Sequence, residues 1–211
     1  MNGKAKKWDF DTYDSIDRYD YIMRNVKRLR YDDTLAAVAR KAMIKKTDVV
    51  LDIGTGNGNL AELLLQNGCK VIGLDPSTKM IELAAPKLAQ FDGRFNIDVC
   101  ENPFLAIPYP NNSFDTVVST FSIHHLPGHD KQLAITEMKR VLKNPGGLIV
   151  IGDVIFKDNE DKARALAQYH DMEDEYQPTL DTFPFMFENA GFAVEIEQVA
   201  DTVYIVSASL I

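Results

Sequence analysis

The chain has 211 residues, of which 45% are hydrophobic, and its 23 Lys and Arg against 31 Asp and Glu give a formal net charge of −8. This length predicts one domain, residues 1–211, with a substantial core. The acidic balance argues against a nucleic-acid substrate, because such binding depends on basic side chains that neutralise phosphates. With two cysteines and no apolar run of the roughly 18 residues that a membrane span needs, we expect a cytoplasmic protein without disulfides or a membrane anchor.

The first 30 residues are dense in aromatic and acidic side chains, among them the neighbours Tyr13 and Asp14. The stretch over 8–30 is too aromatic for a linker and too polar for a core helix. We therefore predict that residues 1–30 form a lid, which packs over a site and becomes ordered when the ligand arrives. An amphipathic helix that merely caps the domain is the alternative.

A helix is expected from Asp32 or Asp33 to about Lys45, because apolar residues recur there at helical spacing after a capping acid. The basic residues at 27–30 and 45–46 are interpreted as a solvated helix face and a helix end.

Residues 49–60, with the sequence VVLDIGTGNGNL, carry the strongest local signal. The apolar run predicts a buried strand, and three glycines at alternate positions predict a tight turn into a helix. Glycine tolerates positive φ and lets backbone approach a ligand, while the N–H groups at a helix start are hydrogen-bond donors. The stretch therefore predicts a strand, turn and helix that bind a small molecule.

The spacing of these glycines discriminates between two classes of ligand. A dinucleotide fingerprint would place a third glycine at position 59, where this chain has Asn59. Asp52, at the end of the strand, would repel a phosphate but suits a cation, such as the ammonium group of an amino acid joined to a nucleoside. A nicotinamide dinucleotide is therefore the weaker alternative.

A second apolar run over 71–75 ends in Asp75, and a helix is expected from Thr78 to about Gln90. Together with the glycine turn, this pattern resembles the first motifs of class I S-adenosylmethionine-dependent methyltransferases. The resemblance implies that Asp75 accepts hydrogen bonds from both ribose hydroxyls. The alternative is that Asp75 is an ordinary helix N-cap, a role that Ser77 could equally fill. The cofactor-binding residues that the resemblance implies are Asp52, Gly54, Thr55, Gly56, Gly58, Asp75, Pro76, Met80 and Thr120.

The adenine contact departs from the family pattern, because Pro103 occupies the position where relatives carry an aspartate. By resemblance, Glu101 or Asn102 takes over the contact to the adenine amino group.

Strands and helices continue to alternate after residue 90, which predicts an α/β, doubly wound and mostly parallel sheet. The expected elements are strands over 95–99, 114–120 and 148–154, a proline-broken loop over 101–113 and a helix over 131–143. Two strand-like runs over 192–199 and 202–210 follow, so close together that they should pair as an antiparallel hairpin. A seven-stranded sheet that ends in such a hairpin resembles the Rossmann-like class I methyltransferase fold, and a symmetric dehydrogenase domain would not predict it.

Residues 119–126, STFSIHHL, follow the fourth expected strand. Ligands bind at the carboxyl ends of strands in an open α/β sheet, so Thr120, Phe121, His124 and His125 are candidates for contact with substrate or cofactor. The stretch resembles the fourth-motif region of small-molecule methyltransferases, which often ends in a His-His-Leu triplet near the transferred methyl group. His124 is the candidate general base, because an ordinary imidazole pKa of about 6.5 allows proton uptake near neutral pH. A packed, hydrogen-bonded core histidine is the alternative.

Residues 156–190 lie between the fifth and sixth expected strands, where this fold commonly inserts substrate-recognising elements. Within them, the acidic and aromatic run over 169–176 either presents carboxylates to a cationic acceptor or forms a solvated helix face, and the solvated face is favoured. His170 and its acidic neighbours do not point together on a helix, so no metal site is predicted.

The pattern over 8–210 most resembles the little-characterised methyltransferases of Gram-positive bacteria. This resemblance implies S-adenosyl-L-methionine as cofactor and in-line transfer of its methyl group to a small-molecule acceptor, with neither nucleic acid nor membrane as a partner. A non-catalytic protein that binds S-adenosylmethionine or S-adenosylhomocysteine is one alternative, and an NAD-dependent oxidoreductase is the weaker one.

Overall fold

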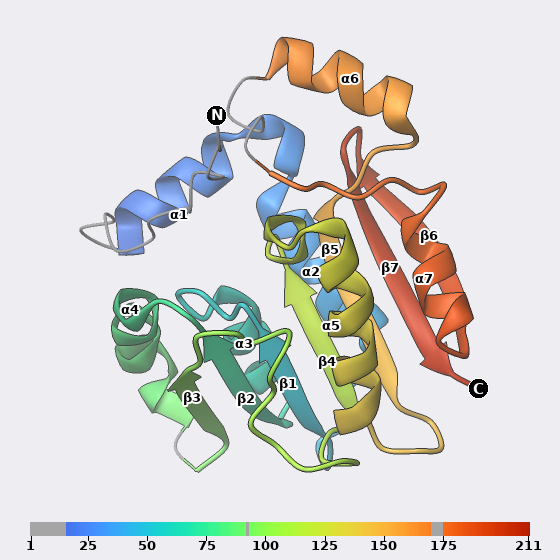
Figure 1. Ribbon diagram of the computed structural model, residues 1–211. Helices are drawn as coiled ribbons and strands as arrows, with labels where there is room; N and C mark the ends of the chain where they lie inside the picture. Colours follow the sequence, from blue (N-terminus) through green and yellow to red (C-terminus); the bar gives the residue numbers. More distant parts are fainter. Residues whose placement is uncertain (1–15, 92, 170–174) are drawn as a thin grey trace.

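The computed structural model describes residues 16–91, 93–169 and 175–211, in which seven strands form one sheet in the order β3-β2-β1-β4-β5-β7-β6 (Figure 1). The strands are β1 (Val49–Ile53), β2 (Lys70–Asp75), β3 (Phe95–Val99), β4 (Thr116–Thr120), β5 (Leu148–Val154), β6 (Phe192–Ala200) and β7 (Val203–Leu210). The described α-helices are α1 (Ile16–Asn25), α2 (Tyr31–Lys41), α3 (Asn59–Gln66), α4 (Thr78–Leu88), α5 (Gly128–Val141), α6 (Asn159–Gln168) and α7 (Phe183–Asn189). Short 3-10 helices are η2 (Lys27–Leu29), η3 (Ala89–Phe91) and η4 (Ile123–His125).

Five neighbouring strands, from β3 to β5, run parallel, and β7 pairs antiparallel with both β5 and β6. The predicted doubly wound sheet with a terminal antiparallel hairpin is therefore confirmed. Because the parallel strands point the same way, the segments that follow β1, β2, β4 and β5 gather at one edge of the sheet.

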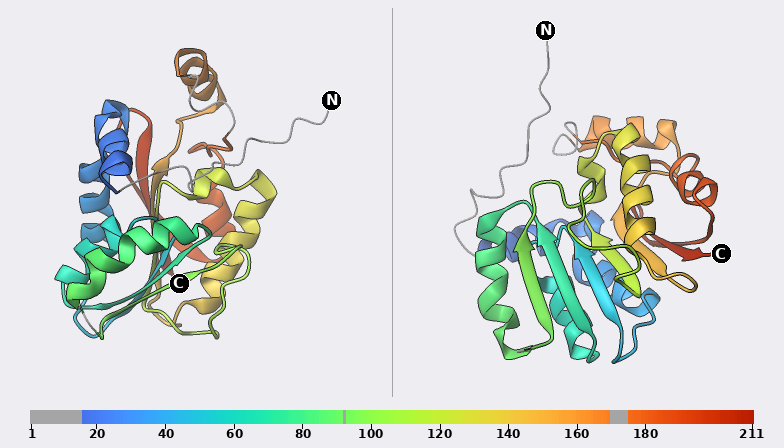
Figure 2. Two further views of the ribbon diagram at one scale, coloured as in Figure 1. Left: turned by 90° about the vertical axis from the view of Figure 1, so that its left-hand side faces the viewer. Right: turned by 60° about the horizontal axis from the view of Figure 1, so that its bottom comes forward.

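Alternate strand residues face two separate apolar layers. Val50 and Val118 pack with α2, α3 and the end of α4, whereas Leu51 and Val117 pack with α5 and α7 on the opposite face. Figure 2 shows the two helical layers with the sheet between them. Strands that are covered on both faces read as continuous apolar runs, which is why β1, β4 and β5 were predictable. None of the described helices is long and apolar enough to cross a membrane.

Several expected boundaries are wrong by a few residues. The helix predicted over 131–143 is α5, which begins three residues earlier because Pro127, with φ −54°, precedes Gly128 in a backbone conformation suited to a helix start. It ends at Val141, since Leu142 is extended and pairs with Phe114. The helix expected to reach Lys45 ends at Lys41. The strand expected over 114–120 begins at Thr116, and α4 passes into η3 instead of continuing to Gln90.

Candidate functional site

The glycine turn after β1 is tied to the end of β2 by backbone hydrogen bonds. The N–H groups of Gly54 and Thr55 donate to the carbonyl of Leu74 at 2.8 and 3.1 Å, and that of Gly56 donates to Asp75 Oδ2 at 2.8 Å. Gly54 and Gly56 both have positive φ, +73° and +54°. At Gly56 a Cβ atom would meet nothing within 4 Å, so the backbone here borders open space. The turn thus presents bare backbone beside the carboxylate of Asp75.

Gly54→Ala is expected to destabilise the fold more than Gly56→Ala. Both variants place a side chain at positive φ, which costs about 1–2 kcal/mol. At Gly54 the new Cβ would also lie 2.1 Å from Ser122 Oγ, so the segment after β4 must move. Urea unfolding of both variants measures the difference, and equal losses of unfolding free energy would contradict the close contact.

Asp52 is a buried carboxylate beneath this turn, 1% exposed. Its Oδ2 accepts a hydrogen bond from Thr55 Oγ1 at 2.7 Å, while Oδ1 is buried without a hydrogen-bond partner among the described residues. Burial, reinforced by the nearby carboxylate of Asp75, raises the pKa of Asp52 to about 7 although the Thr55 hydroxyl opposes the shift. The unpartnered oxygen and the raised pKa both mark a place that favours a cation.

The carboxylate of Asp75, at the end of β2, accepts hydrogen bonds from backbone N–H groups of the glycine turn and of the segment that leads into α4. Its Oδ1 accepts from the N–H of Ser77 at 2.9 Å, and its Oδ2 accepts from Gly56. The N-cap of α4 is Ser77, whose Oγ accepts from the N–H of Met80 at 3.2 Å. The alternative reading of Asp75 as a helix N-cap is therefore wrong.

The remaining predicted cofactor residues differ in exposure. Met80 is 2% exposed. Pro76, Glu101 and Asn102 are exposed, the last two in the bend that follows β3. Gly58, with φ +79°, precedes α3, and a Cβ there would lie 3.1 Å from the side chain of Ala84 in α4. Gly58 thus allows α3 and α4 to pack closely, and the adenine assignment to Glu101 or Asn102 stays a prediction.

Helix α1 is fastened to the glycine turn through Asp20. Its Oδ1 accepts from the side-chain amides of Asn57 at 2.8 Å and Asn59 at 2.7 Å, and its Oδ2 pairs with Arg24 at 2.9 Å. Burial opposes ionisation of Asp20, but these donors outweigh it and lower its pKa. The described part of the predicted lid therefore contacts the predicted cofactor turn. Tyr13 lies outside the described residues, and ordering of the lid on ligand binding stays a prediction.

The segment after β4 borders the same turn. Thr120 is partly buried at the end of β4, and Phe121, with φ +48°, stacks on Tyr31 at a centroid distance of 5.6 Å. The hydroxyl of Tyr31 accepts from Asn59 Nδ2 at 3.1 Å. Together with the contact between Gly54 and Ser122, these interactions bring the two predicted motifs, residues 49–60 and 119–126, into one site.

His124 lies between two carboxylates and is 6% exposed. Its Nδ1 is 2.5 Å from Asp153 Oδ1, and its Nε2 is 3.6 Å from Glu175 Oε1. Burial alone would lower the pKa of His124, but the two carboxylates outweigh it and raise the pKa to about 10. The expectation of an ordinary imidazole pKa is therefore wrong, and in this arrangement His124 is a cation at neutral pH. Whether it contacts the acceptor stays a prediction.

His125 has the opposite electrostatic environment. Its ring centroid lies 4.0 Å from that of His124. Burial, assisted by the positive charge of His124, lowers the pKa of His125 to about 4. At neutral pH His125 is therefore an uncharged imidazole beside a charged one.

Three acidic residues of this site were not predicted: Asp20, Asp153 and Glu175. A signal existed for Asp153, which is the one charged residue in the otherwise apolar run of β5 and is completely buried. Glu175 belongs to the acidic run interpreted as a solvated helix face, and for Glu175 that interpretation is wrong because it is only partly exposed and faces His124. The preceding residues 170–174 lie outside the described part of the chain.

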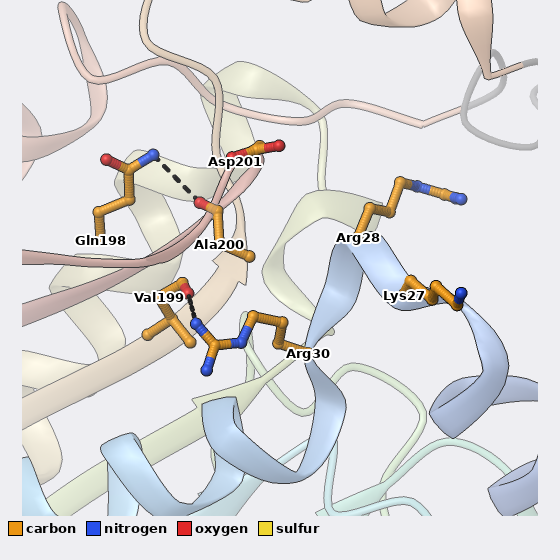
Figure 3. A pocket seen from close by; sticks show the side chains of 7 residues that line it. All are labelled: Lys27, Arg28, Arg30, Gln198, Val199, Ala200 and Asp201. Atoms are coloured by element: carbon orange, nitrogen blue, oxygen red, sulfur yellow. Dashed lines mark hydrogen bonds between the residues drawn. The ribbon is translucent and has the colours of Figure 1, made fainter.

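A hollow of about 380 Å³ opens where η2 faces the turn between β6 and β7 (Figure 3). It is lined by Lys27, Arg28, Arg30, Gln198, Val199, Ala200 and Asp201. Arg30 donates from Nη1 to the carbonyl of Val199 at 2.9 Å, and the Arg28 guanidinium lies 4.8 Å from the ring centroid of Tyr169. Arg30 therefore joins the end of η2 to the hairpin and Arg28 contacts Tyr169, so these two basic residues do more than form a solvated face.

A family model described as a methyltransferase domain matches residues 50–147. An uncharacterised methyltransferase of Geobacillus kaustophilus is 36% identical over 208 residues, which cover 94% of this chain and 92% of that protein. The chain belongs to this methyltransferase family. The prediction of a methyltransferase similar to little-characterised proteins of Gram-positive bacteria is thus confirmed.

Solved structures share the fold of this methyltransferase. A putative methyltransferase in complex with the Haloferax volcanii methyltransferase activator Trm112 has a TM-score of 0.73 and 19% identity, covering 92% of this chain and 94% of that one. A SAM-dependent methyltransferase from Aquifex aeolicus has a TM-score of 0.67 and 24% identity, covering 97% and 100%. The methyltransferase therefore has this fold over nearly its whole length.

Proposed function

We propose that this methyltransferase takes the methyl group from S-adenosylmethionine and transfers it to a small-molecule acceptor. The observation that carries the proposal is the buried Oδ1 of Asp52 at the glycine turn, which has no hydrogen-bond partner in the part of the chain that the structure describes. A buried carboxylate oxygen without a hydrogen-bond partner is costly, and a cationic ammonium group relieves that cost. The donor set of the site therefore fits the amino-acid end of this cofactor.

The ribose end is proposed to bind Asp75. Its two oxygens accept from the N–H groups of Gly56 and Ser77, which fix the carboxylate beside the open backbone at Gly56. The carboxylate is held in place by backbone, so the hydroxyls of a ribose would meet an acceptor of fixed orientation. Met80 is proposed as the neighbouring apolar wall.

When bound, S-adenosylmethionine supplies an electrophilic methyl group on a positively charged sulfur. The chain's own task is then to align the acceptor and exclude water, because the thioether leaves as a neutral group. Thr120, Phe121, His124 and His125, at the carboxyl end of β4, are proposed to border the acceptor. No proton uptake at neutral pH is assigned to His124, because the adjacent carboxylates keep it protonated.

Two features support a small acceptor over a nucleic acid. The net charge of −8 would repel a polyanion at low ionic strength. The region beside the two histidines is also covered by residues 175–177, which are anchored by the N–H of Tyr176 donating to the carbonyl of His124 at 2.8 Å. Because His124 is buried beside this segment, its surroundings suit a compact acceptor better than a nucleic acid.

The dinucleotide alternative is disfavoured by the side chain that replaces the third glycine. Asn59 donates to Asp20 and Tyr31 and accepts from Lys87 Nζ, so this amide holds α1, α2 and α4 together at the start of α3. A pyrophosphate would have to compete with Asp20 and Asp75 for the donors of this turn.

Asp75→Ala is expected to weaken S-adenosylmethionine binding by roughly 10- to 150-fold, because a hydrogen bond to a charged group is worth about 1.5–3 kcal/mol. Isothermal titration with S-adenosylmethionine, S-adenosylhomocysteine and NAD measures this on the wild type and the variant. Glu188→Ala, which removes an exposed carboxylate at the end of α7, is the matched control and should bind as the wild type does. Binding of NAD alone, or of none of the three, would refute the proposed cofactor.

A further inference from the structure

Across residues 16–91, 93–169 and 175–211, one group of side chains brings three potential metal-ligand atoms together. His124, His125 and Glu175 each offer a nitrogen or oxygen, and these atoms all lie within 4.8 Å of one another. The distance from His124 Nε2 to Glu175 Oε1 is 3.6 Å. Two ligands of a tetrahedral zinc ion, each about 2.1 Å from the metal, are separated by about 3.4 Å, so this pair already has nearly the required spacing.

Asp153 fixes the orientation of the His124 ring, as carboxylates that hydrogen-bond to metal-binding histidines do. The carboxylate lies 2.5 Å from Nδ1, so Nδ1 carries a proton in either charge state and Nε2 is the nitrogen left to bind a metal. Asp153 Oδ2 is itself fixed by the N–H groups of Ser122 at 3.1 Å and Ile123 at 2.9 Å. The imidazole therefore presents Nε2 toward Glu175 in a fixed direction.

Glu175 is held from the opposite side. Gln177 Nε2 donates to its Oε2 at 2.8 Å, which leaves Oε1 facing His124. Lys131 Nζ donates to the carbonyls of Leu126 and Tyr176, so the 175–177 segment is bound to the loop that carries both histidines. His124 and Glu175 are 51 residues apart in the sequence. Their ligand atoms converge because the contacts of Lys131 and Tyr176 hold the 175–177 segment against the loop that carries the histidines.

We propose that His124, His125 and Glu175 form a site for a divalent transition-metal ion of the zinc type. Two imidazoles and one carboxylate are the donor set that Zn²⁺ and its first-row neighbours prefer over Mg²⁺ or Ca²⁺. Three protein ligands leave one position of a tetrahedron open, which is the arrangement of sites that bind a substrate atom. Binding exchanges the proton on His124 Nε2 for the ion, and that proton passes to solvent.

The open position would give the ion a role in acceptor recognition, and this role rests on the proposed methyl transfer. The two histidine ligands lie in η4, which follows β4 and the neighbouring Thr120 and Phe121, where the acceptor is proposed to lie. An acceptor with an oxygen, nitrogen or sulfur atom would bind there as the fourth ligand, and its pKa would fall. Binding of the ion itself is independent of methyl transfer and is tested without it.

The experiment uses the full chain without a histidine tag, stripped with chelator and then titrated with Zn²⁺. Wild type is expected to bind one ion, measured by isothermal titration and by elemental analysis after dialysis. Asp153→Asn removes a residue that contacts a ligand but not the metal, and it should weaken Zn²⁺ binding by roughly 10- to 100-fold. Glu175→Gln and His125→Asn remove proposed ligands, so each should weaken Zn²⁺ binding by more than that. Circular dichroism and thermal unfolding confirm that each variant is folded.

His129→Asn is the matched control, because this histidine is 79% exposed and pairs with Asp130 at 2.9 Å. It should bind Zn²⁺ as the wild type does. No ion on the wild type, or unchanged binding by Glu175→Gln and His125→Asn, would overturn the metal site. Titration of the same stripped samples with S-adenosylmethionine is a separate readout, so failure of the metal site and failure of the proposed cofactor give different results.

Discussion

Asp153→Ala is expected to lower the free energy of unfolding by about 3–5 kcal/mol at neutral pH, because it removes the closer partner of a buried ion pair and leaves His124 with only Glu175, 3.6 Å away. The side chain of Asp153 is completely buried, and its contact to His124 Nδ1 is 2.5 Å. The loss also removes the acceptor for the N–H groups of Ser122 and Ile123. Urea unfolding with chelator present measures the effect of the pair without a bound metal.

Two further variants separate this pair from ordinary surface electrostatics. Asp130→Ala removes a carboxylate that pairs with the exposed His129, and it should change the unfolding free energy by no more than about 1 kcal/mol. The double variant His124→Ala with Asp153→Ala should cost less than the two single variants added together, because neither member of this pair is then left without the other. Additive losses would contradict a direct ion pair.

The elements that the sequence predicted well are those whose information is local. The strand and glycine turn of residues 49–60 are encoded by an apolar run and by residues that tolerate positive φ, and all of them lie within a dozen positions. Boundaries were less predictable. The early start of α5 depends on Pro127 and overrides the low helix propensity of Gly128, and its early end depends on the pairing of Leu142 with a residue in another segment, Phe114.

The candidate site shows the same division between local and distant information. The sequence placed His124 at the carboxyl end of β4, and β4 does end at Thr120 just before it. It did not predict the charge state of His124, because the carboxylates responsible, Asp153 and Glu175, are 29 and 51 residues away along the chain. A pKa depends on burial and on neighbouring charges in space, so a short motif fixes a residue's place more readily than its protonation.

Asp52→Asn, unlike Asp153→Ala, is expected to stabilise the protein. At about pH 8 the free energy of unfolding of the ligand-free protein should rise by up to roughly 4 kcal/mol. The pKa of Asp52 rises from 3.8 to about 7 on folding. When the pKa of an acid is raised in the folded state, the unfolded chain releases its proton at a lower pH than the folded protein does. Wild-type stability from this group is therefore greatest below about pH 4 and falls until the pH passes about 7. Asparagine is neutral throughout and avoids the loss.

The measurement is urea unfolding of wild type and Asp52→Asn at about pH 4, 6 and 8, with the difference expected near zero at the lowest pH and largest at the highest. Asp115→Asn is the control with the reverse sign, because Lys143, at 2.8 Å, outweighs burial and lowers the pKa of Asp115. The control should lose stability at pH 8. A stability difference for Asp52→Asn that is constant with pH would mean that this carboxylate is not destabilised by its burial.

The same variant links stability to the proposed function. If the unpartnered Oδ1 of Asp52 exists to meet an ammonium group, the charge that destabilises the free protein is the charge that binds the ligand. Asp52→Asn should therefore bind S-adenosylmethionine more weakly while it unfolds at a higher urea concentration. Wild-type binding should also release protons near pH 6.5, seen as a dependence of the titration heat on the ionisation enthalpy of the buffer, and the asparagine variant should not. A variant that is more stable and binds equally well would separate the two properties and leave Asp52 without a role toward the cofactor.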